Sequence, residues 1–152
     1  MTQTQISRLL NRFEHRYVIV ALLIAHTILA ITYSLRLPVG EGYDEPRHFG
    51  YIHHLAVNRQ LPESSSPLLG YEKIPYRYPP LYYMAVAPVV ACVDMPDNAL
   101  LKPNPYFGNP DGGQNAFIHS TKEDWPFTGT ALAYHLARMV SVIMGTATCF
   151  LT

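Results

Sequence analysis

The chain has 152 residues, of which 49% are hydrophobic and 14% charged, and its formal net charge is zero. Balanced charge leaves no net positive field to attract a phosphate backbone, so a nucleic-acid-binding protein is excluded as the expected class. All 13 prolines fall between Pro38 and Pro126, and the sequence therefore divides into three unlike regions.

Residues 1–16 are expected to form a cytoplasmic N-terminus, and residues 17–37 a transmembrane helix. The run from Tyr17 to Leu35 carries no formal charge, and as a helix it would span about 28 Å, close to the hydrocarbon core of a bilayer. The alternatives are a buried helix of a soluble protein, which usually has a polar face, and a cleaved signal peptide, which usually has a shorter apolar core. Three arginines precede the run, so the positive-inside rule places the N-terminus in the cytoplasm.

Residues 38–130 are expected to form an extracytoplasmic loop with two short interfacial helices. The first helix covers about residues 45–59, with Asp44 at or near the N-cap and Pro46 in the first turn. Its apolar residues recur at helical spacing and suit a helix that lies on the membrane surface. This stripe consists of Phe49, Ile52, Leu55 and Ala56.

The second short helix covers about residues 80–93 and is almost entirely apolar. Pro88 interrupts it, and it is too short to span a bilayer comfortably, so we expect it at the membrane interface. Its tyrosines, Tyr82 and Tyr83, fit the aromatic belt of an interface. Turn-forming residues then dominate residues 94–127, which predicts an ordered but irregular loop.

A second transmembrane helix is expected to start within residues 131–152, with Arg138 near its beginning. The residues after Arg138 cover only about 21 Å as a helix, which is short of a full crossing. We therefore expect the N-terminal part of a longer multi-span protein, with a complete two-span protein as the alternative. The predicted fold class is an all-α membrane protein. Cys92 and Cys149 lie in separate apolar segments and are predicted to be free thiols.

The stretch "GYDEPRHFGYIHHLA", residues 42–56, joins two acids, Asp44 and Glu45, to a histidine, His48. On a helix, spacings of four and three residues bring each acid to the same side as His48. Carboxylate and imidazole groups bind divalent metals, so a metal site is one hypothesis. The other hypothesis is that these side chains only form hydrogen bonds at the interface. No cofactor other than such a metal is expected.

The order of these features resembles polyprenyl-phosphate-dependent membrane glycosyltransferases of the GT-C superfamily. The similar proteins are of the protein-mannosyltransferase and aminoarabinose-transferase type, glycosyltransferase family 39. The shared features are a membrane helix, "DE" at its outer end, a short helix with His48, "YPPLYY" with Tyr78 where the family has a histidine, and Arg138 opening the next helix. The segments "NPYFGNP", "NAFIHS" and "WPFTGTALAYHLAR" are similar to the first-loop extension of some members. The resemblance covers the first two helices of enzymes that usually have eight or more.

This resemblance implies an enzyme of the cell envelope that transfers a sugar from a polyprenyl-phosphate donor to an acceptor on the outer face of the cytoplasmic (inner) membrane. It assigns catalysis to Asp44, with Glu45 beside it, because a carboxylate at the membrane surface can take the proton of the acceptor. The alternative role of Asp44 is to cap the helix that follows. The chain alone is expected to be inactive, since most membrane helices of such an enzyme lie beyond it.

The candidate substrate-binding residues are His48, Arg138, Tyr82 and Tyr83. Arg138 is expected to pair with a phosphate or with an acid of the loop, or to extend its charge to the interface. The two tyrosines are either interfacial anchors or stacking platforms for a sugar. The expected partners are the lipid bilayer and a polyprenyl-phosphate-linked sugar donor.

A second class of function remains open on the sequence alone. A small two-span membrane protein without catalytic activity, whose outer loop binds a partner subunit, would have the same pattern of apolar segments. A reading frame that continues into further hydrophobic spans would favour the enzyme.

Overall fold

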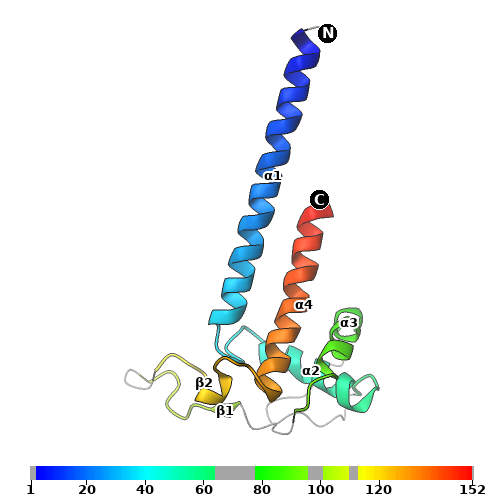
Figure 1. Cartoon of the computed structure of the whole chain (residues 1–152). Coiled ribbons are helices and arrows are strands. Elements are labelled where there is room, and N and C mark those ends of the chain that lie inside the picture. Colours follow the sequence, from blue (N-terminus) through cyan, green and yellow to red (C-terminus); the bar gives the residue numbers. More distant parts are fainter. Residues whose placement is uncertain (1–2, 64–77, 96–100, 110–112, 152) are drawn as a thin grey trace.

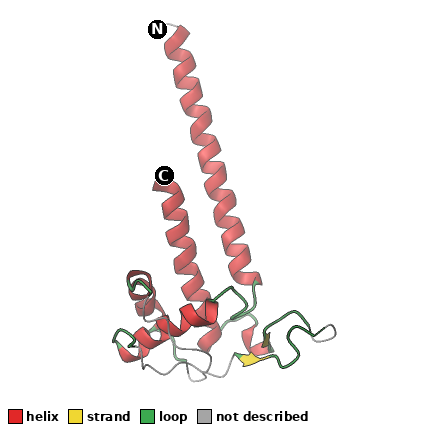
Figure 2. Cartoon of the chain, turned by 180° about the vertical axis from the view of Figure 1, so that it is seen from behind, coloured by secondary structure: helices red, strands yellow, loops and turns green. Residues whose placement is uncertain are grey.

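The computed structural model of the protein describes residues 3–63, 78–95, 101–109 and 113–151. Helices α1 (Gln3–Arg36) and α4 (Gly129–Leu151) are antiparallel neighbours, and the shorter elements gather at one end of this pair (Figure 1). Seen from behind, the same short elements lie beneath the two long helices (Figure 2). The molecule thus consists of a two-helix stem and a folded end.

The stem has the dimensions of a membrane segment. Arg16–Arg36 of α1 and all of α4 are long and apolar enough to cross a membrane. At about 1.5 Å per residue they measure roughly 30 and 35 Å, which matches a hydrocarbon core of roughly 30 Å. Only 6% of the first window and 17% of the second are buried within the protein. Both expected apolar helices are present, but their lengths differ from the predictions. Helix α1 begins earlier, at Gln3. Helix α4 is long enough for a full crossing because it begins nine residues before Arg138, at Gly129, whereas the sequence predicted a helix that falls short of one.

Helices α1 and α4 touch through small and polar side chains. The hydroxyl oxygens of Thr27 and Thr146 lie 3.2 Å apart. A Cβ atom on Gly145 would lie 3.6 Å from Nε2 of His26, so glycine brings α4 close to this histidine without filling the space. Small residues and interhelical hydrogen bonds are typical of helix contacts in membranes.

Helix α2 (Glu45–Asn58) begins where the sequence predicts, with Pro46 in its first turn. Asp44 occupies the N-cap position but has a φ of 57°, and its side chain makes no capping hydrogen bond. A capping side chain normally requires a residue in the β region. The alternative prediction that the Asp44 carboxylate caps this helix is therefore wrong.

The apolar stripe of α2 packs inside the protein and not on a membrane surface. Phe49 and Ile52 are 3% and 2% exposed, and Leu55 and Ala56 pack against the same core. The opposing core residues come from helix α3 and from the first turns of α4, where Tyr134 stacks on Phe49 with ring centroids 3.6 Å apart. The prediction of a surface-lying stripe is wrong, because an apolar stripe does not specify whether lipid or protein covers it.

Helix α3 (Leu81–Val90) is shorter than predicted. Pro88 lies inside the helix, which ends two residues later, as expected when a turn lacks a backbone N–H donor. Tyr83 is 4% exposed and stacks on Tyr51 with ring centroids 4.0 Å apart. The prediction that Tyr83 anchors the protein in the interface is therefore wrong, whereas Tyr82 is only half-buried.

The described part of the outer loop is ordered and largely irregular, as predicted. It contains a pair of two-residue antiparallel strands, β1 (Lys102–Pro103) and β2 (Phe117–Ile118), and a 3-10 helix, η1 (Thr121–Glu123). Residues 64–77, 96–100 and 110–112 of the predicted outer loop lie outside the described residues. Both cysteines are free, as expected.

Candidate functional site

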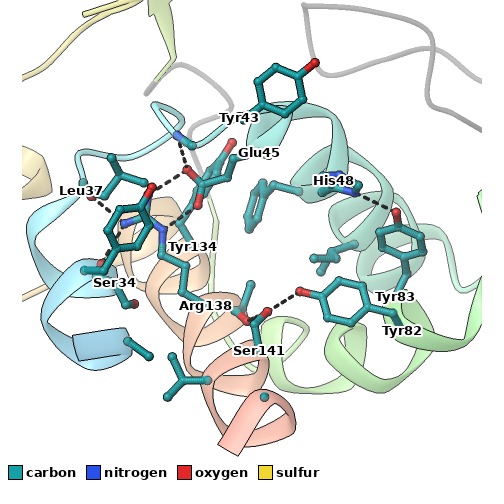
Figure 3. Close-up of a pocket in the computed structure, with 18 of the residues that line it drawn as sticks. Ser34, Leu37, Tyr43, Glu45, His48, Tyr82, Tyr83, Tyr134, Arg138 and Ser141 are labelled. Carbon is teal, nitrogen blue, oxygen red and sulfur yellow. Dashed lines mark hydrogen bonds and ion pairs between the residues drawn. The ribbon is translucent and has the colours of Figure 1, made fainter. Parts of the chain in front are cut away.

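A pocket of about 810 Å³ lies where the stem meets the folded end (Figure 3). Residues from α1 and α4 form one part of its wall, and residues from α2, α3 and the turn after α1 form the rest. Most of the wall is apolar or aromatic, with few polar groups, as is usual for binding sites of small molecules. The polar lining residues are His26, Tyr33, Ser34, Tyr43, Glu45, His48, Tyr82, Tyr83, Tyr134, Arg138 and Ser141.

Arg138 of α4 makes the densest set of polar contacts in the described structure. Its Nε and Nη2 groups donate to the two carboxylate oxygens of Glu45. Its Nη1 group donates to the carbonyls of Ser34 and Leu37 at 2.9 and 2.6 Å, and Nη2 donates to that of Pro38 at 2.9 Å. A guanidinium has five N–H donors, and all five are used here. Arg138 therefore joins the C-terminal end of α1 to α2.

Glu45 is engaged from the other side as well. Its Oε2 atom accepts hydrogen bonds from the backbone N–H groups of Gly40 and Gly42 at 3.1 and 3.2 Å. With the two bonds from Arg138, the carboxylate accepts four hydrogen bonds, which is about its full capacity. Glu45 lines the pocket, but its oxygens are occupied by the protein itself.

Asp44, the expected catalytic acid, lies beside the pocket. Its neighbours Tyr43 and Glu45 line the pocket, but Asp44 does not. Its Oδ1 atom lies 3.2 Å from Nη1 of Arg47, and its side chain is 29% exposed. Its αL backbone is accessible to Asp at modest cost, because a short polar side chain tolerates this conformation. Asp44 is thus an accessible carboxylate at the rim.

His48 lies on α2 in a stack of aromatic rings. Its ring centroid is 5.4 Å from that of Tyr78 and 5.9 Å from that of Tyr83, and Nδ1 lies 2.8 Å from the Tyr83 hydroxyl. Within the described part of the chain, Nε2 of His48 has no hydrogen-bond partner. Burial raises the pKa of Tyr83 to about 12, so its phenol stays protonated at neutral pH. The stack holds His48 in place and leaves one ring nitrogen for a ligand.

Tyr82 and Ser141 close the pocket between α3 and α4. The Tyr82 hydroxyl lies 2.6 Å from Oγ of Ser141, which also donates to the carbonyl of Ala137 at 3.2 Å. Either hydroxyl can be the donor in the pair of Tyr82 and Ser141. In both arrangements the tyrosine oxygen keeps at least one lone pair for another donor.

The four predicted substrate-binding residues, His48, Arg138, Tyr82 and Tyr83, all line this one pocket. The metal candidates do not form a site. Glu45 is held by Arg138, and Nδ1 of His48 is paired with Tyr83. Within the residues that the structure describes, no group of three or more histidine, cysteine or acidic side chains could hold a metal ion.

One polar cluster was missed by the sequence analysis. His119 lies between two carboxylates, with Nδ1 2.8 Å from Oε2 of Glu123 and Nε2 3.0 Å from Oε1 of Glu41. Glu41 also accepts the backbone N–H groups of Ala116 and Phe117. In the sequence, only the spacing of four residues between His119 and Glu123 could have indicated this contact. Glu41 lies 78 positions away from His119, so no sequence pattern connects them. We call these three side chains the His119 cluster.

Comparisons with known proteins assign no family or function to the chain. No protein-family model, no curated protein and no solved structure matches the chain.

Proposed function

We propose that the chain is the N-terminal part of an integral membrane glycosyltransferase. In this proposal it transfers a sugar from a polyprenyl-phosphate donor to an acceptor on the outer face of the cytoplasmic membrane, and its N-terminus is cytoplasmic. The observation that carries the proposal is the pocket at the junction of the stem and the folded end. A lipid-linked acceptor needs such a place, because its chain stays in the bilayer while its head group reacts at the interface.

The proposed transfer is a single displacement. An acceptor oxygen attacks the anomeric carbon, the bond from that carbon to the phosphate oxygen breaks, and the lipid phosphate leaves with the bonding electron pair. Asp44 takes the acceptor proton. The contacts favour Asp44 over Glu45 for this role, because four donors already occupy the Glu45 carboxylate, whereas only one oxygen of Asp44 is paired with Arg47.

Arg138 is not a phosphate ligand in this proposal. All five of its donors are used within the protein, so binding a phosphate would break contacts that join α1 to α2. The phosphate would be bound by parts of the enzyme outside this chain.

The test begins with the gene. If the reading frame continues beyond Thr152 into further hydrophobic spans, the full product in proteoliposomes should transfer sugar from a polyprenyl-phosphate donor to a lipid or protein acceptor. The 152-residue chain alone should show no turnover above background. Turnover by this chain alone would contradict the proposal that it is one part of a larger catalytic unit, and an inactive full product would contradict the enzyme itself.

The exposed aromatic side chains of the outer loop favour the second function, a non-catalytic two-span protein that binds a partner subunit. Tyr106, Phe107 and Trp125 are 65%, 57% and 82% exposed. Aromatic residues are enriched at protein interfaces. A reading frame that stops at Thr152, together with co-purification of a defined partner that is lost on Trp125→Ala, would support this function instead.

A further inference from the structure

The polar end of the pocket has no net charge, and the guanidinium group of Arg138 has no N–H donor left for a ligand. Glu45 and Arg138 are the only acidic or basic residues among those that line the described pocket, if histidine is set aside. Their charges cancel, and the guanidinium donors are all used. A phosphate or carboxylate ligand needs charged or fixed N–H donors. The charged residues of the pocket wall leave no free donor for an anion, so its charge distribution disfavours an anionic head group.

The remaining polar groups suit a ligand that both donates and accepts hydrogen bonds. The Tyr82 oxygen keeps at least one lone pair for a ligand, whether it donates to Ser141 or accepts from it. His48 presents Nε2, which donates or accepts according to the tautomer set by its bond with Tyr83. Hydroxyl groups can meet both kinds of partner, and aromatic rings beside them provide flat apolar surface. A hydroxyl-rich, uncharged head group fits this end of the pocket.

The other end of the pocket runs along the stem, and His26 is a polar residue among its otherwise small and apolar lining side chains. On α4, Arg138, Val142 and Gly145 follow at spacings of four and three residues, so they share one face. From Arg138 to Gly145 the helix advances about 10 Å. Ala30 and His26 of α1 line the pocket opposite this face. Gly145 has no side chain to fill this end of the pocket. A Cβ atom there would make an ordinary contact with His26, so a methyl group would fit, whereas a larger side chain would occupy the space.

We propose that the pocket binds an uncharged glycolipid-like amphiphile, with its hydroxyl-bearing head group at Tyr82, His48 and Ser141 and the first part of its chain along Gly145. This inference goes beyond the proposed function. It concerns binding by the chain itself, and it holds whether or not the protein transfers a sugar. In a glycosyltransferase, such a ligand would be a lipid acceptor with a free hydroxyl.

The experiment uses the whole chain in phosphatidylcholine nanodiscs. The probe is dodecyl glucoside with a diazirine in its alkyl chain, and crosslinked residues are identified by mass spectrometry. Labelling should centre on Val142 and Gly145 and should be competed by unlabelled dodecyl glucoside. Dodecyl phosphate should compete at least about tenfold less well, because the pocket supplies no free charged donor.

Matched variants connect the labelling to the pocket. Tyr82→Phe removes one hydroxyl and should weaken competition by dodecyl glucoside roughly fivefold, the usual effect of one hydrogen bond. Gly145→Leu should block labelling, because its side chain would fill the pocket. Gly145→Ala should retain labelling, because a methyl group leaves the contact between α1 and α4 intact. Tyr106→Phe, on the exposed outer loop, should change nothing.

Three results would overturn the proposal. The first is competition by dodecyl phosphate equal to or stronger than that by dodecyl glucoside. The second is labelling spread over the outward face of α1, at Leu22 and Leu29, and unaffected by Gly145→Leu. The third is an unchanged competition curve for Tyr82→Phe. None of these results depends on transfer activity, so a failure of the glycosyltransferase proposal would be seen separately.

Discussion

Arg138 and Glu45 form a charged contact whose worth depends on both partners being present. Their side chains are only 11% and 17% exposed. Besides bonding to each other, Glu45 accepts hydrogen bonds from backbone N–H groups and Arg138 donates to backbone carbonyls. Removing one partner of a buried pair leaves an uncompensated charge, which costs more than the intact pair contributes. The backbone around residues 34–42 therefore depends on this contact.

Arg138→Lys should destabilise the protein despite keeping the charge. A lysine ammonium has three donors and cannot reproduce the fork that holds both Glu45 oxygens and three carbonyls. We expect a loss of about 2 to 4 kcal/mol, near the range for a broken buried pair, measured as a lower thermal midpoint in nanodiscs. Arg47→Lys is the control, because Arg47 is only half-buried and its ion pair with Asp44 is partly open to solvent. It should cost under about 1 kcal/mol. Equal midpoints for the two variants would contradict the role of Arg138.

Asp44→Asn separates chemistry from folding at the rim of the pocket. Asn tolerates the αL conformation about as well as Asp does, so stability should be unchanged. In the full-length enzyme the loss of a general base should lower the transfer rate about 10²- to 10⁴-fold. Glu45→Gln is the comparison and should lower stability through the contact with Arg138. Near-normal turnover by Asp44→Asn at normal expression would show that Asp44 is not the base.

At the scale of elements, the His119 cluster joins the turn after α1 to the loop that leads into α4. Burial lowers the pKa of His119. Hydrogen bonds to Glu123 and Glu41 and the charges of these two carboxylates raise the pKa by more than burial lowers it, so the net shift is upward. A protonated imidazole bonds to both carboxylates, whereas a neutral one has a single N–H. The attachment of the loop is therefore strongest when His119 is charged.

This upward shift fixes the sign of the pH dependence. The stabilisation is fully present below the ordinary histidine pKa of about 6.5 and is lost as the pH rises through the higher pKa of the folded protein. The thermal midpoint of the wild type should exceed that of His119→Gln at about pH 5.5, and the difference should shrink by about pH 8.5. An NMR titration of the His119 ring should give a pKa above 6.5. A difference that grows with pH would contradict the assignment.

Gly40, in the turn after α1, lies close to the outer loop at Leu101. Its φ is +83°, and a Cβ atom there would collide with the Leu101 side chain. Gly40→Ala should therefore lower stability by about 1 to 3 kcal/mol, from the αL conformation and from overpacking. Gly108→Ala is the matched control. Gly108 also has a φ of +83°, but no atom of the described residues lies within 4 Å of the position that its Cβ atom would take. Equal losses would mean that only the backbone conformation matters and that the contact with Leu101 does not.

For the whole molecule, the short elements that the structure describes all lie at one end of the stem (Figure 1), and we predict that they lie on the same side of a membrane. In the orientation that we propose from the arginines near the N-terminus, that side is the outer one. In a background of Cys92→Ser and Cys149→Ser, single cysteines at the exposed positions Val57 and Asn115 should both react with an impermeant thiol reagent added from outside. A cysteine at Ser7 should react only after the membrane is opened.

The position of Asn115 makes this test sensitive to α3. If Asn115→Cys reacts only after the membrane is opened while Val57→Cys reacts from outside, then the apolar stretch from Leu81 to Val93 crosses the bilayer. The folded end would then be two separate segments, and the contacts of α3 with α2 and α4 would be wrong. Labelling of both positions from outside supports one folded end.

The sequence by itself determined the local features of this protein, because each depends on residues that are near one another in the chain. The apolar character of α1 and α4, the start of α2 at Glu45 with Pro46 in its first turn, and the free cysteines follow from composition and spacing. The sequence also selected His48, Tyr82, Tyr83 and Arg138, and all four reach the pocket.

Only the tertiary structure decided what covers each surface and which charges meet. Arg138 takes Glu45 as its partner across 93 positions of sequence, and Glu41 meets His119 across 78. The stripe of α2 is buried by α3 and α4, although its spacing would equally suit a membrane surface. Periodicity fixes the direction of an apolar face but not its neighbour, and the desolvation of a charged pair depends on every segment around it.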